Sequence, residues 1–207
     1  MSATVTARHR VALAGFVCDA ITKKAVAGAV VSMTANVPPA FKGRLKLYEA
    51  QFGVAWNAMT ERRDRTRSRM DGLFYFLDLP EGDYELNISA PALGKRFGSV
   101  TQTAKVARDA KQNYHLEWAE VSLTPTTIEG SITCKKVNIG FAQVRVQGSG
   151  ESAFSNEDGR YTISGVEPGK RTLLIYAQGH KPATQPVTIK KPGDLRTVDI
   201  KLIDNAS

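Results

Sequence analysis

The chain contains one pattern twice, first as DGLFYFLDLPEG at 71–82 and again as DGRYTISGVEPG at 158–169. Gly72 and Gly82 of the first copy have the same spacing as Gly159 and Gly169 of the second, and aromatic or aliphatic residues fill matching positions between them. Upstream, the segments 14–17 and 129–132 also resemble each other. Internal similarity at a constant spacing indicates one structural module used twice.

Both copies begin and end with turn chemistry. An Asp-Gly pair flanked by strand-like residues predicts a tight turn, since glycine accepts the positive φ that hairpin turns require. A proline followed closely by the last glycine predicts a second turn, because proline restricts one φ and glycine supplies the other. The predicted turn residues are Asp71, Gly72, Gly82, Asp158, Gly159 and Gly169.

Around these turns the chain is made of short segments of alternating polarity. In 84–89, for example, Tyr84, Leu86 and Ile88 fall on one face. Six or seven such strands in about 80–90 residues, separated by turns, are typical of an all-β sandwich. We therefore predict two tandem sandwich domains, 1–123 and 124–207, with a hinge around Pro125.

The first copy carries an insertion. Ala142 matches Ala29 at a numbering offset of 113, whereas the two Asp-Gly turns match at an offset of 87. The difference of 26 is the length of an insert between the second strand of the first copy and its Asp-Gly turn. The insert, about 36–65, shows an apolar stripe at helical spacing, entered through Pro38 and weakened at Gly43 and Gly53. The stripe consists of Phe41, Leu45, Tyr48, Phe52, Trp56 and Met59.

Two interpretations of this stripe are open. The first is that the helix packs on its own sandwich, which is the usual role of an amphipathic face. The second is that the six residues contact a partner protein, and they are the best partner-contact candidates in the chain.

Taken together, the glycine-containing first strand, the Ala-x-Val-x-Val segment at 142–146 and the repeated Asp-Gly pattern resemble the carboxypeptidase regulatory-like domain. That resemblance covers both repeats apart from the insertion. It implies a transthyretin-like, seven-stranded sandwich, but it does not imply a function, because such modules occur in many proteins. One departure is Arg171, which stands where the first copy has Tyr84 and leaves one core contact open.

Composition and charge exclude several classes. Hydrophobic residues make up 42% and charged residues 23%, as in ordinary globular proteins, and no apolar run approaches the ~20 residues of a membrane-spanning helix. The first ten residues are polar and predict no signal peptide, so we expect a cytoplasmic protein.

The net charge of +8 comes from scattered residues. The densest stretch, 61–69, includes two acids, and Arg65, Arg67 and Arg69 would share one face of a strand. A solvated sheet face is therefore favoured over nucleic-acid binding. Cys18 and Cys134 fall at nearly the same place in the two repeats, so we predict two small buried groups in different domains, without a disulfide.

Catalytic and metal motifs are missing from the sequence. His9, His115 and His180 are the only histidines, and none has a glutamate three residues later, as a zinc peptidase pattern would require. No Gly-x-Ser-x-Gly elbow and no phosphate-binding Gly-Lys-Ser/Thr loop occurs. We therefore predict no catalytic residues, no cofactor and no metal.

These features favour a structural or protein-binding component of a multi-protein assembly, whose partners are other proteins of the assembly or further copies of the chain. The helical insert and the motif after it look similar to small accessory proteins of phage-tail-like contractile injection systems, particles that assemble in the cytoplasm and leave by lysis. The alternatives are a carbohydrate- or surface-binding module, which needs an exposed pair of Trp or Tyr, and a regulatory domain bound one-to-one to a separate enzyme.

Overall fold

The computed structural model describes residues 9–111 and 113–205, and in it the chain forms two compact units. Unit 1 runs to Ala92 and resumes over Ser99–Leu123, whereas unit 2 combines Leu93–Gly98 with the chain from Thr124 onward. Most of the N-terminal stretch used for the signal-peptide prediction lies outside the described residues. Among the described residues, no helix has both the length and the apolar character needed to cross a membrane.

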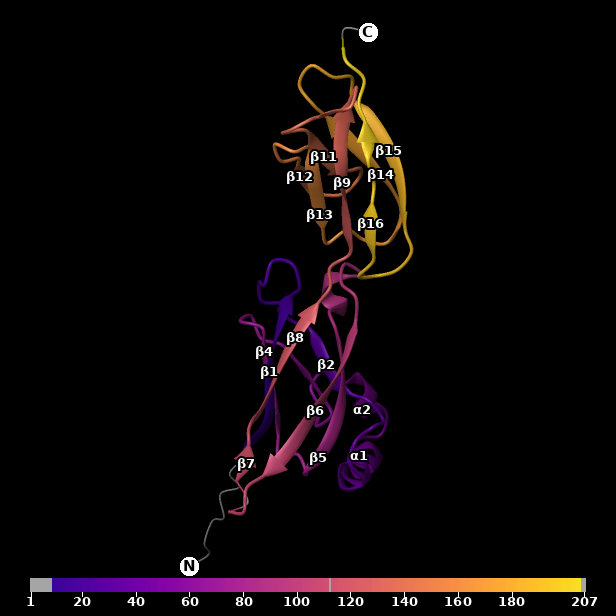
Figure 1. Cartoon of the computed structure of the whole chain (residues 1–207). Helices are drawn as coiled ribbons and strands as arrows, with labels where there is room; N and C mark the ends of the chain where they lie inside the picture. The colour runs from indigo at the N-terminus through magenta and orange to yellow at the C-terminus, as the bar shows by residue number, and fades with distance from the viewer. Residues whose placement is uncertain (1–8, 112, 206–207) are drawn as a thin grey trace, which may run out of the picture. The chain divides into compact units, whose positions relative to one another are not determined.

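Unit 1 is a sandwich of two sheets. One sheet has the strand order β4-β1-β8 and the other β3-β2-β5-β6-β7, with the helices α1 and α2 between β2 and β3 (Figure 1). The elements are β1 (Val11–Asp19), β2 (Val30–Met33), α1 (Pro39–Phe52), α2 (Val54–Ala58), β3 (Arg65–Arg67), β4 (Leu73–Leu77), β5 (Gly82–Ser89), β6 (Val100–Arg108), β7 (Tyr114–His115) and β8 (Glu117–Leu123). A short 3-10 helix, η1 (Pro91–Leu93), follows β5.

Unit 2 repeats this topology. Its sheets have the orders β10-β9-β13, with β16 and β17 also paired to β9, and β12-β11-β14-β15. In both units the last strand runs parallel to the first, as β8 does along β1. The elements are β9 (Thr127–Cys134), β10 (Val137–Asn138), β11 (Gln143–Val146), β12 (Ser152–Phe154), β13 (Arg160–Ser164), β14 (Gly169–Tyr176), β15 (Ala183–Ile189), β16 (Leu195–Thr197) and β17 (Ile200–Lys201).

The structure confirms the all-β class and the helical insertion. The connection from Met33 to Arg65 exceeds the equivalent one from Val146 to Ser152 by the predicted length of the insert. The short strand β3 lies where the sequence analysis considers a strand for the arginines, whereas β10 and β12 are not indicated by the sequence, because two or three residues are too few to show a period.

The repeated motif forms the predicted turns, but not hairpins. The Gly72 N–H donates to the Arg69 carbonyl and the Gly159 N–H to the Asn156 carbonyl, each at 2.9 Å, and both glycines have positive φ. The strands before and after each turn belong to different sheets, and the second turns, which end at Gly82 and Gly169, return the chain across the sandwich. The motif thus marks the points where the chain changes layer.

The polar side chain that supports the Asp-Gly turn differs between the copies. Asp71 Oδ1 accepts the Leu73 N–H at 3.0 Å. In the second copy the equivalent N–H, that of Arg160, donates to Asn156 Oδ1 at 2.8 Å. Asn156 therefore accepts the hydrogen bond that the repeat would assign to Asp158.

Each unit has its own core between its two sheets. In unit 2 the buried cluster includes Ile128, Ile132, Val144, Ile163 and Leu173, all from inward positions of strands. In unit 1 the largest fully buried side chain is Tyr84. Inward-facing residues alternate with exposed ones along the strands, as the two-residue period requires.

The two cysteines are not equivalent, contrary to the prediction. Cys134 is buried, but Cys18 is only partly buried and its thiol lies 3.4 Å from the Ser122 hydroxyl. Val17 points into the core of unit 1, so Cys18 beside it faces outward. Both thiols are free and belong to different units.

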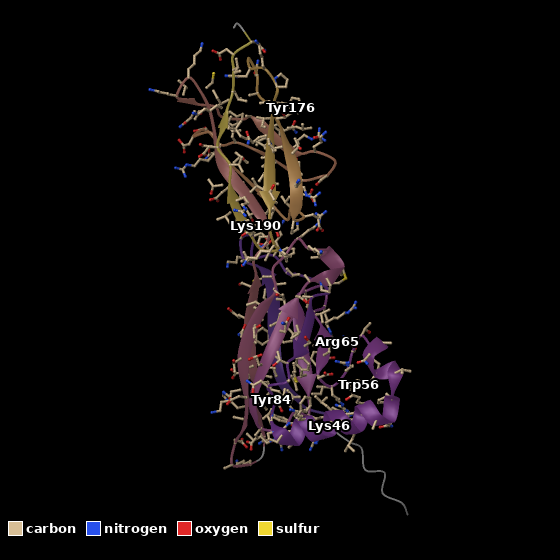
Figure 2. The ribbon with its side chains drawn as sticks, turned by 90° about the vertical axis from the view of Figure 1, so that its right-hand side faces the viewer. Lys46, Trp56, Arg65, Tyr84, Tyr176 and Lys190 are labelled. Carbon is tan, nitrogen blue, oxygen red and sulfur yellow. The ribbon has the colours of Figure 1, made fainter. Side chains whose placement is uncertain are left out.

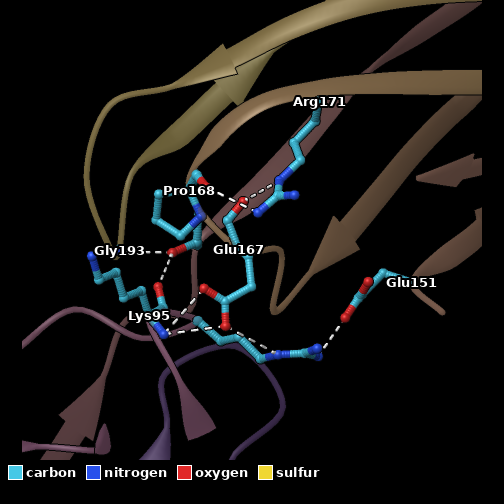
Figure 3. A network of polar contacts seen from close by, with 8 residues as sticks. Lys95, Glu151, Glu167, Pro168, Arg171 and Gly193 are labelled. Carbon is cyan, nitrogen blue, oxygen red and sulfur yellow. Dashed lines mark hydrogen bonds and ion pairs between the residues drawn. The ribbon is translucent and has the colours of Figure 1, made fainter. Parts of the chain in front are cut away.

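The main division between the units falls between Leu123 and Thr124, where the boundary was predicted; in addition, the segment Leu93–Gly98 comes from the first repeat but is part of unit 2. Its Lys95 N–H donates to the Glu167 carboxylate, and Arg96 pairs with Glu151 and Glu167 (Figure 3). The Thr126 N–H also donates to the Arg96 carbonyl at 2.7 Å. Unit 2 therefore takes in a segment that precedes β6 in the sequence.

Candidate interaction surfaces

The helical insert is two helices rather than one. Pro38 is the N-cap of α1 and Pro39 occupies its first turn, where a missing N–H costs no helical hydrogen bond. Gly53 ends the helix with a φ of 54° and donates its N–H to the Glu49 carbonyl at 2.8 Å. Its left-handed backbone separates α1 from α2, which is the weak point that the sequence indicated.

Two of the six stripe residues are unavailable to a partner. Phe41 and Trp56 are buried, and the edge of the Phe41 ring meets the Tyr84 ring at 5.6 Å between centroids. Figure 2 labels Trp56 and Lys46 in the helical insert and Tyr84 in the sandwich. Phe41 therefore packs on its own sandwich, whereas the ring contacts of Trp56 are with Tyr48 and Phe52 of the insert. Partner contact stays a prediction for the other four residues of the stripe.

The outer part of the stripe forms an aromatic cluster. The rings of Tyr48, Phe52 and Trp56 are nearly parallel, with centroids 6.1–6.5 Å apart. The Arg62 guanidinium lies 4.8 Å from the Trp56 ring centroid and makes two 2.9 Å hydrogen bonds to Asp64. This pairing fixes Arg62 in place against the cluster.

An open groove of about 400 Å³ is lined by the three aromatic rings, by Met59 and by the charged residues Glu61, Arg62 and Arg63. In the same two helices, Leu47 is 72% exposed and Val54 is 94% exposed, although neither lines the groove. We call the exposed residues Leu47, Phe52 and Val54, together with this groove, the insert surface.

Positive charge is concentrated in the same segment, so the net charge is less scattered than the sequence analysis took it to be. Residues 42–69 contain eight Lys and Arg against three Asp and Glu, so more than half of the net charge of +8 lies here. Within the described part of the chain β3 pairs only with β2, which places it at the edge of its sheet. The predicted arginine face is only partly solvated, since Arg65 is half-buried and donates to the Met59 carbonyl, whereas Arg67 is exposed.

A second exposed surface lies on the β4-β1-β8 sheet of unit 1. Tyr75 and Trp118 are both paired in register with Ala14, so the two aromatic rings flank a small residue on one outward face. Their side chains are 38% and 50% exposed. The Arg69 guanidinium, however, lies 5.0 Å from the Tyr75 ring centroid and donates to its hydroxyl at 2.9 Å.

One group of potential metal ligands among the described residues was missed by the sequence. Cys134, His180 and Asp204 come from three separate segments of unit 2 and lie together. The Cys134 thiol donates to Asp204 at 3.2 Å, and this bond to a carboxylate raises the thiol pKa. A raised pKa is the reverse of what a cysteine nucleophile needs.

Comparison with solved structures gives matches of low sequence identity. They include the shaft pilin SpaA from Lactobacillus rhamnosus GG, with 10% identity over 96% of this chain and 98% of the pilin and a TM-score of 0.41. The Bacillus anthracis TIE protein shares 15% identity over 94% of this chain and 34% of its own, with a TM-score of 0.40.

A chain of a mutant type II cohesin–X-dockerin complex from Acetivibrio cellulolyticus shares 18% identity over 38% of this chain, with a TM-score of 0.32; the match spans 58% of that chain. No curated protein matches at a significant level. The family model of the carboxypeptidase regulatory-like domain matches residues 127–203, entirely within unit 2. The second repeat therefore matches the family that the repeated pattern resembles.

Proposed function

We propose that this protein is a non-catalytic, protein-binding component of a multi-protein assembly, and that the insert surface is its contact site. The observation behind the proposal is the exposure of Leu47, Phe52 and Val54 in a segment that unit 2 lacks. Exposed apolar side chains in one segment, next to a groove lined by aromatic and charged residues, are typical of a protein interface.

The charge of the insert indicates the chemistry of the partner. A segment with a surplus of lysine and arginine attracts an acidic surface and accelerates association with it. The exposed apolar residues then supply the buried contact area that lowers the dissociation rate. We therefore expect an acidic protein surface that presents at least one apolar side chain.

The setting that we propose is a phage-tail-like contractile injection system, assembled in the cytoplasm and released by lysis. The support is the tandem arrangement of two sandwich modules and the helical insert in the first one. In such a particle the chain would occupy repeated positions and contact tail or baseplate proteins.

The test is affinity purification of the tagged chain from its own cell extract, followed by mass spectrometry and by binding measurements on the partner obtained. The variant Leu47→Glu/Val54→Glu places acids on the insert surface without touching the core. The control, Val137→Glu/Ile203→Glu, changes two exposed apolar residues of unit 2.

The proposal predicts that the insert variant weakens binding about tenfold or more, that the control does not, and that added salt weakens binding by the wild-type chain. Equal binding by both variants would contradict the insert surface as the contact site. Sheath, tube or baseplate proteins among the partners would support the particle, whereas one enzyme in a one-to-one complex would support a regulatory domain instead.

Carbohydrate binding is a second candidate, favoured by the Tyr75 and Trp118 rings on one sheet face. Aromatic rings on a flat surface stack against sugar rings. The Arg69 guanidinium over Tyr75 competes with such stacking, which makes this function the weaker of the two. A glycan array with the wild-type chain and Trp118→Ala tests it: binding that the substitution abolishes would support it, and no binding would exclude it.

A further inference from the structure

Three segments of unit 2 meet at one end of the β9 strand. Cys134 is the last residue of β9, His180 lies in the turn between β14 and β15, and Asp204 follows β17. Backbone bonds hold these segments in place: the Leu202 N–H donates to the Thr133 carbonyl at 2.7 Å and the Asn205 N–H to the Gly179 carbonyl at 3.1 Å. The three side chains are therefore positioned by the sheet and not by flexible loops.

The distances within this group suit one small metal ion. Asp204 Oδ1 lies 3.2 Å from Cys134 Sγ and 3.4 Å from His180 Nε2, and all three atoms fall within 4.8 Å of one another. Tetrahedral Zn²⁺ with its usual bond lengths separates a sulfur and an oxygen ligand by about 3.6 Å and a nitrogen and an oxygen ligand by about 3.4 Å. The two pairs that include Asp204 are within a few tenths of an ångström of that geometry, whereas Cys134 Sγ and His180 Nε2, which lie within 4.8 Å of each other, would have to come to about 3.6 Å.

The histidine is already oriented as a metal-bound histidine is. His180 Nδ1 lies 2.8 Å from the Gln178 carbonyl, an acceptor, so Nδ1 carries a proton, and Nε2, 3.4 Å from Asp204 Oδ1, is the nitrogen whose lone pair would bind the ion. Ligating histidines commonly donate their other ring N–H in this way. The His180 side chain is only 14% exposed, so water competes weakly for the lone pair.

The ligand types select the metal. A thiolate, an imidazole and a carboxylate suit Zn²⁺, whereas Ca²⁺ and Mg²⁺ prefer sites made only of oxygen. The thiolate and the carboxylate together balance the two charges of Zn²⁺. The Lys135 ammonium, 2.7 Å from Asp204 Oδ2, balances the carboxylate in the absence of an ion, and its exposed side chain is free to swing into water.

From this geometry we infer that Cys134, His180 and Asp204 form a Zn²⁺ site, with the fourth position left for water or for a ligand from a partner. The ion would fasten the segment after β17 to β9 and to the β14–β15 turn. Because Zn²⁺ would bind the folded chain and not the unfolded one, it would stabilise unit 2 once the Zn²⁺ concentration exceeds the dissociation constant of the site.

The test uses the purified full-length chain, treated with a chelator and titrated with Co²⁺ and then Zn²⁺. We expect one Co²⁺ per chain, a thiolate-to-Co²⁺ charge-transfer band, displacement of Co²⁺ by Zn²⁺ and a higher unfolding temperature with Zn²⁺. Cys134→Ser should remove the band and weaken binding by at least about 100-fold, while Cys18→Ser, which changes the cysteine of unit 1, should leave both intact.

A second variant keeps the test valid if Cys134→Ser fails to fold. Lys135→Ala alters an exposed side chain and removes the charge that competes for Asp204, so it should tighten metal binding by up to about fivefold. Unchanged or weaker binding by Lys135→Ala would contradict Asp204 as a ligand. The absence of a charge-transfer band in the wild-type chain, or its loss in Cys18→Ser but not in Cys134→Ser, would overturn the site.

Discussion

At the level of single residues, the two repeats satisfy the same backbone group with different side chains. The Tyr84 hydroxyl donates to the Pro80 carbonyl at 2.8 Å, four residues earlier. At the equivalent place in unit 2, Arg171 Nε donates to the Glu167 carbonyl, also at 2.8 Å (Figure 3). The substitution that the sequence marked as a departure thus keeps the bond that holds the turn, because both side chains offer a donor at similar reach.

This equivalence predicts the outcome of exchanging the side chain. Arg171→Met should lower the free energy of unfolding of unit 2 by about 1–2 kcal/mol, since it leaves the turn carbonyls unpaired. Arg171→Tyr should recover at least half of that loss by restoring a donor to Glu167. Amide exchange of β14 in the two variants measures the difference, and equal losses would show that the bond does not stabilise the turn.

Two buried tyrosines predict a loss of stability at high pH. Burial raises the pKa of the Tyr84 and Tyr161 hydroxyls above the ordinary value of 10.0, so the folded chain keeps protons that the unfolded chain releases. Their contribution is complete below pH 10, and above it the free energy of unfolding falls by up to about 1.4 kcal/mol per pH unit for each group.

Denaturant unfolding between pH 9 and pH 12 measures this slope. Replacing either Tyr84 or Tyr161 by Phe should make it shallower, whereas the control Tyr176→Phe, at an exposed position, should leave it unchanged. A slope that is the same in all four proteins would show that other groups cause the alkaline loss.

At the level of elements, the insert is an addition to a sandwich that is complete without it. Unit 2 connects β11 to β12 directly and has the same sheet topology as unit 1. The insert contacts the sandwich through the buried Phe41, which packs against Tyr84, while Leu47 and Val54 remain exposed. An element attached in this way can present an interaction surface without loosening the sheets that support it.

Two glycines of the insert should respond in opposite ways to alanine. Gly43 lies inside α1 with open space around it, so Gly43→Ala should stabilise the helix by about 0.5–1 kcal/mol. Gly53 has a φ of 54°, so Gly53→Ala should cost about 1 kcal/mol or more in backbone strain. Amide exchange in 41–58 provides the measurement, and stabilisation by Gly53→Ala would mean that α1 and α2 can join.

At the level of the whole molecule, the chain does not divide at a single point. Leu93–Gly98 is part of the first repeat in sequence but of unit 2 in the structure, where Arg96 pairs with the mostly buried Glu151 (Figure 3). A fragment that begins at Thr124 would lack both this arginine and the Lys95 N–H bonded to Glu167. The sequence repeat and the compact unit are thus different divisions of the same chain.

Loss of Arg96 should therefore weaken unit 2 even though the residue comes from the first repeat. Arg96→Ala should cost about 1–2 kcal/mol, less than for a fully buried pair because Arg96 is 44% exposed. The cost should shrink when Glu151 is replaced by Gln. Both tryptophans lie in unit 1, so amide exchange of β9 is the suitable probe. An equal cost in both backgrounds would show that Arg96 acts independently of Glu151.

What the sequence determined by itself was the module: its repetition, its turns, most of its strands and the length of the insert. Turn chemistry and two-residue alternation act over a few neighbouring residues, so they can be recognised locally. The break between α1 and α2 at Gly53 can also be recognised locally, because it depends on the positive φ that glycine adopts at that one position.

Only the tertiary structure decided which distant segments meet. It buried Phe41 and Trp56 but left Leu47 and Val54 exposed, and it moved Leu93–Gly98 into unit 2. It also gathered Cys134, His180 and Asp204, which share no motif because they lie far apart along the chain. Contacts of this kind depend on how two sheets bring remote strand ends together, and no short stretch of sequence records that.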